Sequence, residues 1–456
     1  MKLPRPFRST PVRFLAAFML LFAACGSGGP ASPGVPDGPR ADAAPPADAP
    51  VVADGPRPDA LPADAPSGPD GPLEPPTGVM TVEPGCTRSG CIRELVRKDD
   101  YDLDLIRGFA APGTLIDNGI RTYFVRYMSD GDEITGTVGV PDGTPPQGGW
   151  PVAVVNQFTT GIALSCAPSA GIFAPVVVAP TATHGILTLA PDAPSYGPPP
   201  SGVYLASKPA ARAALDGVRA AFALAQGIGQ PVARRALVVG LSQGGHSTMA
   251  AAAEQPLYAP RLEVRGFVSV APASGMRASL TASVRAGTGF SAYGAMRLYS
   301  WQRYYMLSGG QLFRGSFVTD GPMWLESECV FDPQNGATGP LYTRFPADPA
   351  MVLSDTFLGY ARDDAWPADW ARIYTESEPL PRAGGAPILL VQGSADTTVS
   401  QATTDSYVAS LRSRGTNLEY RVVPGATHTG TALGALTIPQ AAERATLDWI
   451  QQHLGP

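Results

Sequence analysis

Residues 235–246, with the sequence RALVVGLSQGGH, indicate the fold most clearly. Residues 236–239 are a continuous apolar run of the kind that forms a strand buried on both faces. Ser242 follows at the centre of a Gly-x-Ser-x-Gly pattern, and an Ala-rich helical pattern occupies residues 247–254. In so Gly-rich a chain, chance would supply this pattern in roughly one of three sequences, so its place between a strand and a helix carries the argument.

The tight turn at Ser242 has a chemical consequence. A strand-to-helix turn of this kind strains the backbone and presents the serine hydroxyl at the carboxyl edge of a sheet. Gly240 and Gly244 are small enough to make room for it. The amide of Gln243 faces the same space and is expected to stabilise an oxyanion. Ser242 is therefore the predicted nucleophile.

Apolar strands alternate with helical segments on both sides of this turn. The predicted strands are 121–127, 134–141, 151–155, 185–190, 235–240, 265–270, 387–391 and 418–423, and the predicted helices are 206–225 and 247–254. Strand–helix–strand units give parallel strands with helices on the faces of the sheet. The sequence thus predicts an α/β fold with a mostly parallel, doubly wound sheet.

One stretch interrupts the alternation. Residues 276–380 hold 17 of the 37 aromatic residues, and strand–helix alternation disappears there. We predict that this segment is an inserted cap, and that residues 79–275 and 381–456 form the catalytic core. Its aromatic side chains are expected mainly to form the core of the cap, because large apolar groups stabilise chiefly by burial.

A serine hydroxyl needs a base, and the chain has four histidines. His246 lies one turn past Ser242 and is expected to pack beneath the turn. His184 precedes a strand and so lies at the wrong edge of the sheet, while His453 falls in a polar C-terminal helix. His428 remains, in a loop after the predicted strand 418–423, and is the predicted general base.

The orienting acid is predicted to be Asp396. It follows the apolar strand 387–391 and a Gly turn, and it lies between Ser242 and His428 in sequence. A carboxylate there would hold the imidazole in the productive tautomer and stabilise its protonated form. The alternative is a turn-capping aspartate. The chain order Ser, Asp, His is that of the α/β-hydrolases and differs from the chymotrypsin and subtilisin orders.

The N-terminus has the parts of an export signal. Residues 1–24 combine basic residues with an apolar run at 14–24 that is too short to span a bilayer. Small residues before Cys25 resemble a bacterial lipobox, which predicts lipidation of Cys25 and attachment to a membrane of the cell envelope. Simple secretion after cleavage near Ala24 is the alternative.

Residues 25–78 are predicted to be a disordered tether. Fifteen of the 53 residues at 26–78 are proline and none is aromatic. Such a segment buries too little apolar surface to offset the entropy of ordering. The net charge of −6 and the lack of a basic patch argue against a nucleic-acid partner.

The other four cysteines suggest disulfides, since an even number in an exported chain is typical of disulfide pairing. Three pairings are possible. Cys86 and Cys91 could close a small loop, which would leave Cys166 to pair with Cys329. No Cys-x-x-Cys or His/Cys cluster suggests a metal site.

Four short motifs together resemble those of the secretory lipases, the lipase A-like α/β-hydrolases. They are Thr-Thr-Gly at 159–161, Cys-Ala-Pro-Ser at 166–169, Leu-Ala-Pro-Asp at 189–192 and Gly-Leu-Ser-Gln-Gly-Gly-His at 240–246. The likeness extends from about residue 116 to the C-terminus. It implies that Thr159 supplies the first oxyanion-hole amide, and that Cys166 is tied to the cap, which supports pairing with Cys329. The family commonly has His-Gly before Thr-Thr-Gly, where this chain has Gln157 and Phe158.

These patterns predict a carboxylic-ester hydrolase of the lipase/esterase class (EC 3.1.1). The substrate would be a small-molecule or lipid ester, and no metal or organic cofactor is required. Two other interpretations share the fold. One is a serine peptidase or amidase of prolyl-oligopeptidase type, for which no N-terminal propeller is seen. The other is a surface binding protein on an inactive hydrolase scaffold.

Overall fold

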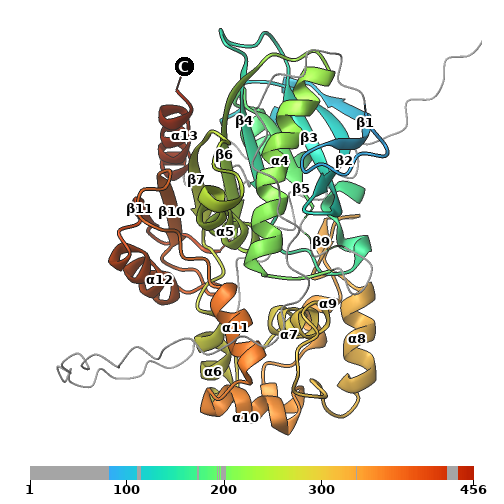
Figure 1. Ribbon diagram of the computed structural model, residues 1–456, viewed down its shortest axis with the longest axis vertical. Helices are drawn as coiled ribbons and strands as arrows, with labels where there is room; N and C mark the ends of the chain where they lie inside the picture. Colours follow the sequence, from blue (N-terminus) through green and yellow to red (C-terminus); the bar gives the residue numbers. More distant parts are fainter. Residues whose placement is uncertain are drawn as a thin grey trace, which may run out of the picture. The chain divides into compact units, whose positions relative to one another are not determined.

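A mixed sheet in the order β1-β2-β3-β5-β4-β6-β7-β10-β11 forms the centre of the computed structural model (Figure 1). The structure describes residues 82–109, 115–171, 174–192, 194, 196, 202–334, 336–428 and 440–455. The strands of this sheet are β1 (Ile92–Tyr101), β2 (Ile120–Ser129), β3 (Asp132–Pro141), β4 (Trp150–Asn156), β5 (Leu187–Pro191), β6 (Val232–Leu241), β7 (Val264–Val270), β10 (Ile388–Gly393) and β11 (Leu418–Val423). From β5 to β11 all neighbours are parallel, and β1, β2, β3 and β5 pair antiparallel.

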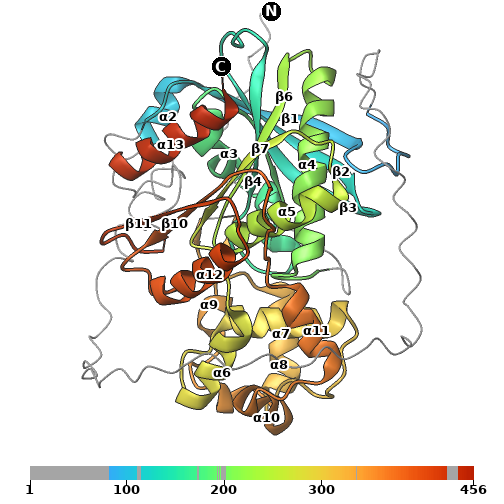
Figure 2. The same ribbon diagram turned by 60° about the vertical axis from the view of Figure 1, so that its left-hand side comes forward.

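Helices cover both faces of the sheet (Figure 2). Outside the cap they are α2 (Leu103–Phe109), α3 (Ala174–Ala182), α4 (Ser207–Gly227), α5 (Gln243–Tyr258), α12 (Gln401–Ser413) and α13 (Gln440–Leu454), with short 3-10 turns η1 (Leu164–Cys166) and η2 (Pro168–Ala170). Alternate residues of β6 face opposite sides: Val238 packs in the cluster with α4, α5 and α12, and Leu237 in the cluster with α13. This two-sided burial explains the continuous apolar runs in the sequence. The predicted doubly wound α/β fold is confirmed.

The predicted cap, residues 276–380, lies between β7 and β10 in sequence and consists mainly of helices. They are α6 (Met276–Ala286), α7 (Ala292–Tyr304), α8 (Phe317–Ser327), α9 (Leu341–Arg344), α10 (Asp355–Asp363) and α11 (Ala368–Glu376), with the 3-10 turn η3 (Pro349–Met351) and a small hairpin of β8 (Phe331–Asp332) and β9 (Ala337–Thr338). Trp301, Phe357 and Trp370 are fully buried in an apolar cluster that also includes Ile162 and residues 203–206. The aromatic residues of this segment therefore make up much of that buried cluster.

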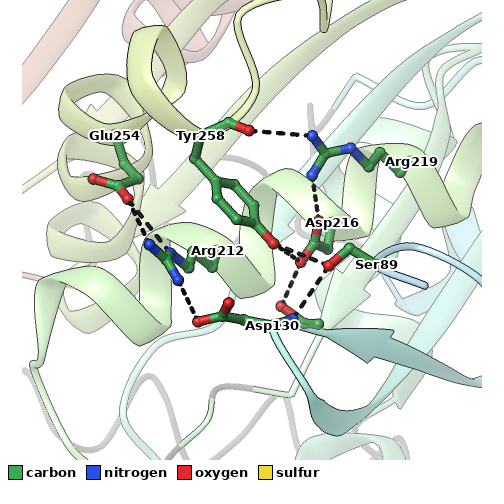
Figure 3. Close-up of polar contacts among 8 residues, drawn as sticks. Ser89, Asp130, Arg212, Asp216, Arg219, Glu254 and Tyr258 are labelled. Carbon is green, nitrogen blue, oxygen red and sulfur yellow. Dashed lines mark hydrogen bonds and ion pairs between the residues drawn. The ribbon is translucent and has the colours of Figure 1, made fainter. Parts of the chain in front are cut away.

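A buried carboxylate on α4 fixes this helix to the β2–β3 turn (Figure 3). Asp216 on α4 is fully buried and accepts hydrogen bonds from Ser129 Oγ and Tyr258 Oη, both at 2.8 Å. Arg219 pairs with its other oxygen, and the Arg212 guanidinium lies 4.7 Å from the Tyr258 ring centroid. Burial raises the pKa of Asp216, against which the Arg219 charge and the hydroxyl donors act. The network holds α4, α5 and the hairpin in one frame.

Several sequence predictions fall outside the described residues. The signal at 1–24, the tether at 25–78 and the lipidated Cys25 are among them. In the described part of the chain, no helix is long and apolar enough to cross a membrane. Cys86 and Cys91 form a disulfide just before β1.

Candidate active site

Ser242 occupies the turn between β6 and α5 in a conformation that few residues adopt. Its backbone angles are φ 59° and ψ −114°. Its N–H donates to Val270 O at 2.9 Å, and its carbonyl accepts from the amides of His246 and Ala273. Strain of this kind persists only where the surroundings fix it, and it is common at functional sites. The turn therefore has the geometry expected of a nucleophile at the carboxyl edge of the sheet.

The two glycines of the motif are required by close backbone contacts. A Cβ atom at Gly240 would lie 2.2 Å from Gly244 O. A Cβ at Gly244 would lie 2.1 Å from Asn156 O and 2.9 Å from Gln157 O. The glycines thus let β6, α5 and the loop after β4 meet around Ser242. They also place the start of α5 against the loop that contains Thr159.

Asp396 and His428 are hydrogen-bonded to each other. Asp396 Oδ2 lies 2.7 Å from His428 Nδ1, and Asp396 Oδ1 accepts the amides of Thr398 and Val399 at 2.8 Å. Burial would raise the pKa of the Asp396 carboxyl, but His428 and the two amides outweigh it, so the net pKa lies below its usual value. Asp396 therefore remains ionised beside the imidazole, and the geometry places the Nδ1 hydrogen between them.

Sheet order relates this pair to Ser242. Ser242 follows β6, Asp396 follows β10 and His428 follows β11, and these strands run parallel with β7 between β6 and β10. The carboxyl ends of parallel strands meet at one edge of a sheet. The structure thus brings Asp396 and His428 into contact and puts Ser242 at the same edge.

Asp396 is supported by a residue that was not predicted from the sequence. Gln392, a fully buried residue of β10, donates from Nε2 to Asp396 Oδ2 at 3.2 Å. Thr404 on α12 donates its hydroxyl to Gln392 Oε1 at 2.7 Å, which fixes the amide orientation. A glutamine in an otherwise apolar buried strand is the sequence signal that would have found it.

The two predicted oxyanion residues come from two different segments, the start of α5 and the loop after β4. Gln243 is the first residue of α5, and first-turn amides point out of the N-terminal end, where partial positive charge gathers. Thr159 is buried after β4, and its hydroxyl shares a 2.8 Å hydrogen bond with Tyr204 Oη. The hydroxyl of Thr159 is thereby engaged within the protein, which leaves its backbone amide as the candidate donor.

The other three histidines have different surroundings. His184 Nδ1 lies 3.0 Å from Asp117, and the half-buried His453 ring stacks on Trp449. His246 is fully buried, and its Nε2 lies 2.8 Å from Ser377 O, so that nitrogen donates. Burial lowers the pKa of His246 to about 4.

His246 is expected to make stability depend on pH. The unfolded chain, with an ordinary histidine pKa near 6.5, binds more protons between pH 6.5 and 4 than the folded one. The contribution of His246 is therefore complete above pH 6.5 and decreases by about 3 kcal/mol as the pH falls to 4. Urea unfolding at several pH values should show a shallower acid-side decline in His246→Gln, which retains a donor for Ser377. An identical decline in both proteins would contradict this account.

The other two cysteines lie beside the loop of residues 157–161, which follows β4 and contains Thr159. Cys166 and Cys329 are joined, which links the loop after β4 to the cap. Among the described residues, no group of three His, Cys, Asp or Glu side chains is placed to hold a metal ion.

Two family models match parts of the sequence. The family model "Secretory lipase" matches residues 174–302, which include Ser242. The model "Prolyl oligopeptidase family" matches residues 350–456, which include Asp396 and His428. No curated protein matches the sequence significantly.

Solved structures show the same architecture. A rice cell wall degrading esterase, LipA from Xanthomonas oryzae, has a TM-score of 0.66 at 18% identity, with 80% of this chain and 100% of that chain covered. The fold is that of an α/β-hydrolase. A putative hydrolase from Legionella pneumophila gives 0.66 at 18% identity, covering 79% and 98% of the two chains. Candida antarctica lipase A in its closed state gives 0.57 at 15% identity, covering 81% and 83%. The resemblance to the secretory lipases is confirmed.

Proposed function

We propose that the chain is a serine carboxylic-ester hydrolase of the lipase/esterase class, EC 3.1.1, with Ser242, His428 and Asp396 as its triad. The hydrogen bond between Asp396 and His428, at the sheet edge that bears the strained Ser242 turn, carries the proposal. A buried carboxylate with a lowered pKa, hydrogen-bonded to an imidazole, is the arrangement that orients the general base of a serine nucleophile. The chemistry requires no cofactor.

The first half of the reaction forms an acyl-enzyme. Ser242 Oγ attacks the ester carbonyl carbon while His428 Nε2 accepts the hydroxyl proton. The carbonyl oxygen becomes an oxyanion, held by the backbone amides of Gln243 and Thr159. The tetrahedral intermediate then collapses, and the C–O bond to the alcohol breaks as His428 returns the proton to the leaving oxygen.

The second half releases the acid. His428 removes a proton from a water molecule that attacks the acyl carbon, and the same two amides hold the new oxyanion. Collapse breaks the bond to Ser242 Oγ, which regains the proton from His428. Asp396 stabilises the imidazolium in both halves and does not itself accept the proton.

An ester series tests the class of reaction. The structural neighbours include a cell wall degrading esterase and a lipase, so both short and long acyl chains belong in the assay. We expect the wild-type protein to hydrolyse p-nitrophenyl esters somewhere between acetate and palmitate, with the preferred chain length set by the cap. A folded wild-type protein that hydrolyses none of them would contradict the proposal and favour a binding protein on a hydrolase scaffold.

A peptidase or amidase is the second candidate, because the prolyl oligopeptidase model matches residues 350–456. A prolyl p-nitroanilide placed beside the ester series separates the two. The ester hydrolase is expected to show a kcat/KM for the best ester far above that for the anilide. The reverse order would favour the peptidase.

We further propose that the protein is exported and held at a membrane through lipidated Cys25. The two disulfides are typical of proteins that fold outside the cytosol. Processing at Cys25 should be sensitive to globomycin, and insensitive processing near Ala24 would instead indicate simple secretion.

A further inference from the structure

Tyr204 belongs to the catalytic core by sequence but is held by the cap. Its N–H donates to Ser300 Oγ at 3.1 Å, and its carbonyl accepts from Trp301 Nε1 at 2.7 Å. Ser300 and Trp301 are both buried on α7, a helix on the core-facing side of the cap in both views (Figures 1 and 2). Residues 203–206 also pack in the apolar cluster of the cap. The backbone of this segment therefore follows α7.

The side chain of Tyr204 reaches residues 157–161, the loop that contains Thr159. Its hydroxyl shares the 2.8 Å hydrogen bond with Thr159 Oγ1, and both residues are buried, at 3% and 8% exposure. Burial raises the pKa of the Tyr204 phenol well above its usual value, so the hydroxyl stays neutral. The next residue, Leu205, has φ 55°, a conformation that a branched side chain adopts only when its surroundings impose it. Tyr204 is thus held at both ends: its backbone is hydrogen-bonded to α7, and its hydroxyl is hydrogen-bonded to Thr159.

The cap also holds the other side of the same loop. Thr160 O accepts the amides of Val330 and Phe331 at 2.8 and 3.1 Å. Gly161 packs against the disulfide, where a Cβ atom would lie 2.6 Å from Cys166 Sγ. Two sets of contacts therefore hold residues 159–161. Cap residues 329–331 contact Thr160 and Gly161, and Tyr204, which is bound to α7, contacts Thr159.

We infer that Tyr204 is a positioning residue that couples cap helix α7 to Thr159, so that the oxyanion hole is complete only when the cap is in place. This inference rests on the proposed function, in which the Thr159 amide binds the oxyanion. Oxyanion donors act only when held within a few tenths of an ångström of the developing charge, and misplacement lowers the rate of the chemical step. A coupling of this kind acts on transition-state stabilisation more than on substrate binding.

Tyr204→Phe removes the hydrogen bond and keeps the ring. We expect kcat for the best p-nitrophenyl ester to fall about tenfold, with KM changed less than twofold. A trifluoromethyl ketone, whose adduct with a serine carries an oxyanion, should lose inhibition by the same factor. The matched control is Tyr127→Phe, which removes a buried hydroxyl that donates to Ala213 O at 2.7 Å in the core. That variant should keep kcat within twofold even where its melting temperature falls.

Double mutants test the path of the coupling. If Tyr204 acts through the Thr159 hydroxyl, Thr159→Val should lower kcat by itself and add nothing in the Tyr204→Phe background. Ser300→Ala, which removes the acceptor on α7, should lower kcat about threefold alone and have no effect once Tyr204 is Phe.

The outcomes separate the inference from the proposed function. Ester turnover by the wild type, with Tyr204→Phe no slower than Tyr127→Phe, would overturn the coupling alone. Multiplicative effects of Tyr204→Phe with Thr159→Val or Ser300→Ala would also overturn it. Absence of ester turnover by folded wild-type protein would overturn the proposed function, and the inference with it.

Discussion

Ser242→Ala should lower kcat/KM for the best p-nitrophenyl ester by about 10⁴-fold or more, to a rate set by the remaining oxyanion donors. The variant removes the only atom that forms the acyl-enzyme and leaves the turn otherwise intact. Alanine meets the same φ of 59° as serine, so the backbone strain is little changed. Initial rates at several substrate concentrations, together with a melting curve, measure the effect.

A second serine at a helix start provides the control. Ser354 caps α10 in the cap, where its hydroxyl accepts the Phe357 amide. Ser354→Ala is expected to cost about 1 kcal/mol of stability and to leave kcat within twofold. Substantial activity in folded Ser242→Ala would mean that another residue is the nucleophile.

His428→Ala should lower kcat by a factor similar to Ser242→Ala, because a serine without its base is a poor nucleophile. The two groups act as one unit, so the double variant should be no slower than either single variant. Stopped assays at high enzyme concentration can measure these residual rates. His184→Ala is the control, since that imidazole pairs with Asp117 and belongs to no part of the proposed site.

Two results would contradict the assignment of His428. One is near-normal turnover in folded His428→Ala. The other is a double variant much slower than either single variant, which would show that Ser242 and His428 act independently.

The central strands were predictable because their burial has a simple signature. Val238 and Leu237 pack on opposite faces of the sheet, so both positions must be apolar, and the sequence shows a continuous run. β1 was not predicted. It is an edge strand with the sequence IRELVRKDDY, mostly half-buried or exposed, so it shows no apolar run. Its pairing with β2 is a long-range contact that local pattern does not reveal.

Some residues of the candidate site could likewise be predicted from the sequence, and others could not. Ser242, Asp396 and His428 each follow a strand, and the parallel order of those strands brings their ends to one edge, which local pattern and topology suffice to predict. Tyr204 contacts Thr159 and Trp301, which are 45 and 97 residues away in sequence, whereas Gln392 contacts Asp396 and Thr404, 4 and 12 residues away. The role of Tyr204 depends on how α7 packs against the core, and that of Gln392 on Thr404 of α12. Only the folded chain shows those contacts.

The most direct test of the triad is covalent labelling with a fluorophosphonate, which reacts with an activated serine. We predict one adduct per chain, located on Ser242 by peptide mass spectrometry, formed with loss of ester turnover and strongly slowed in His428→Ala. An adduct on a different residue, or full loss of turnover with Ser242 unmodified, would contradict the account.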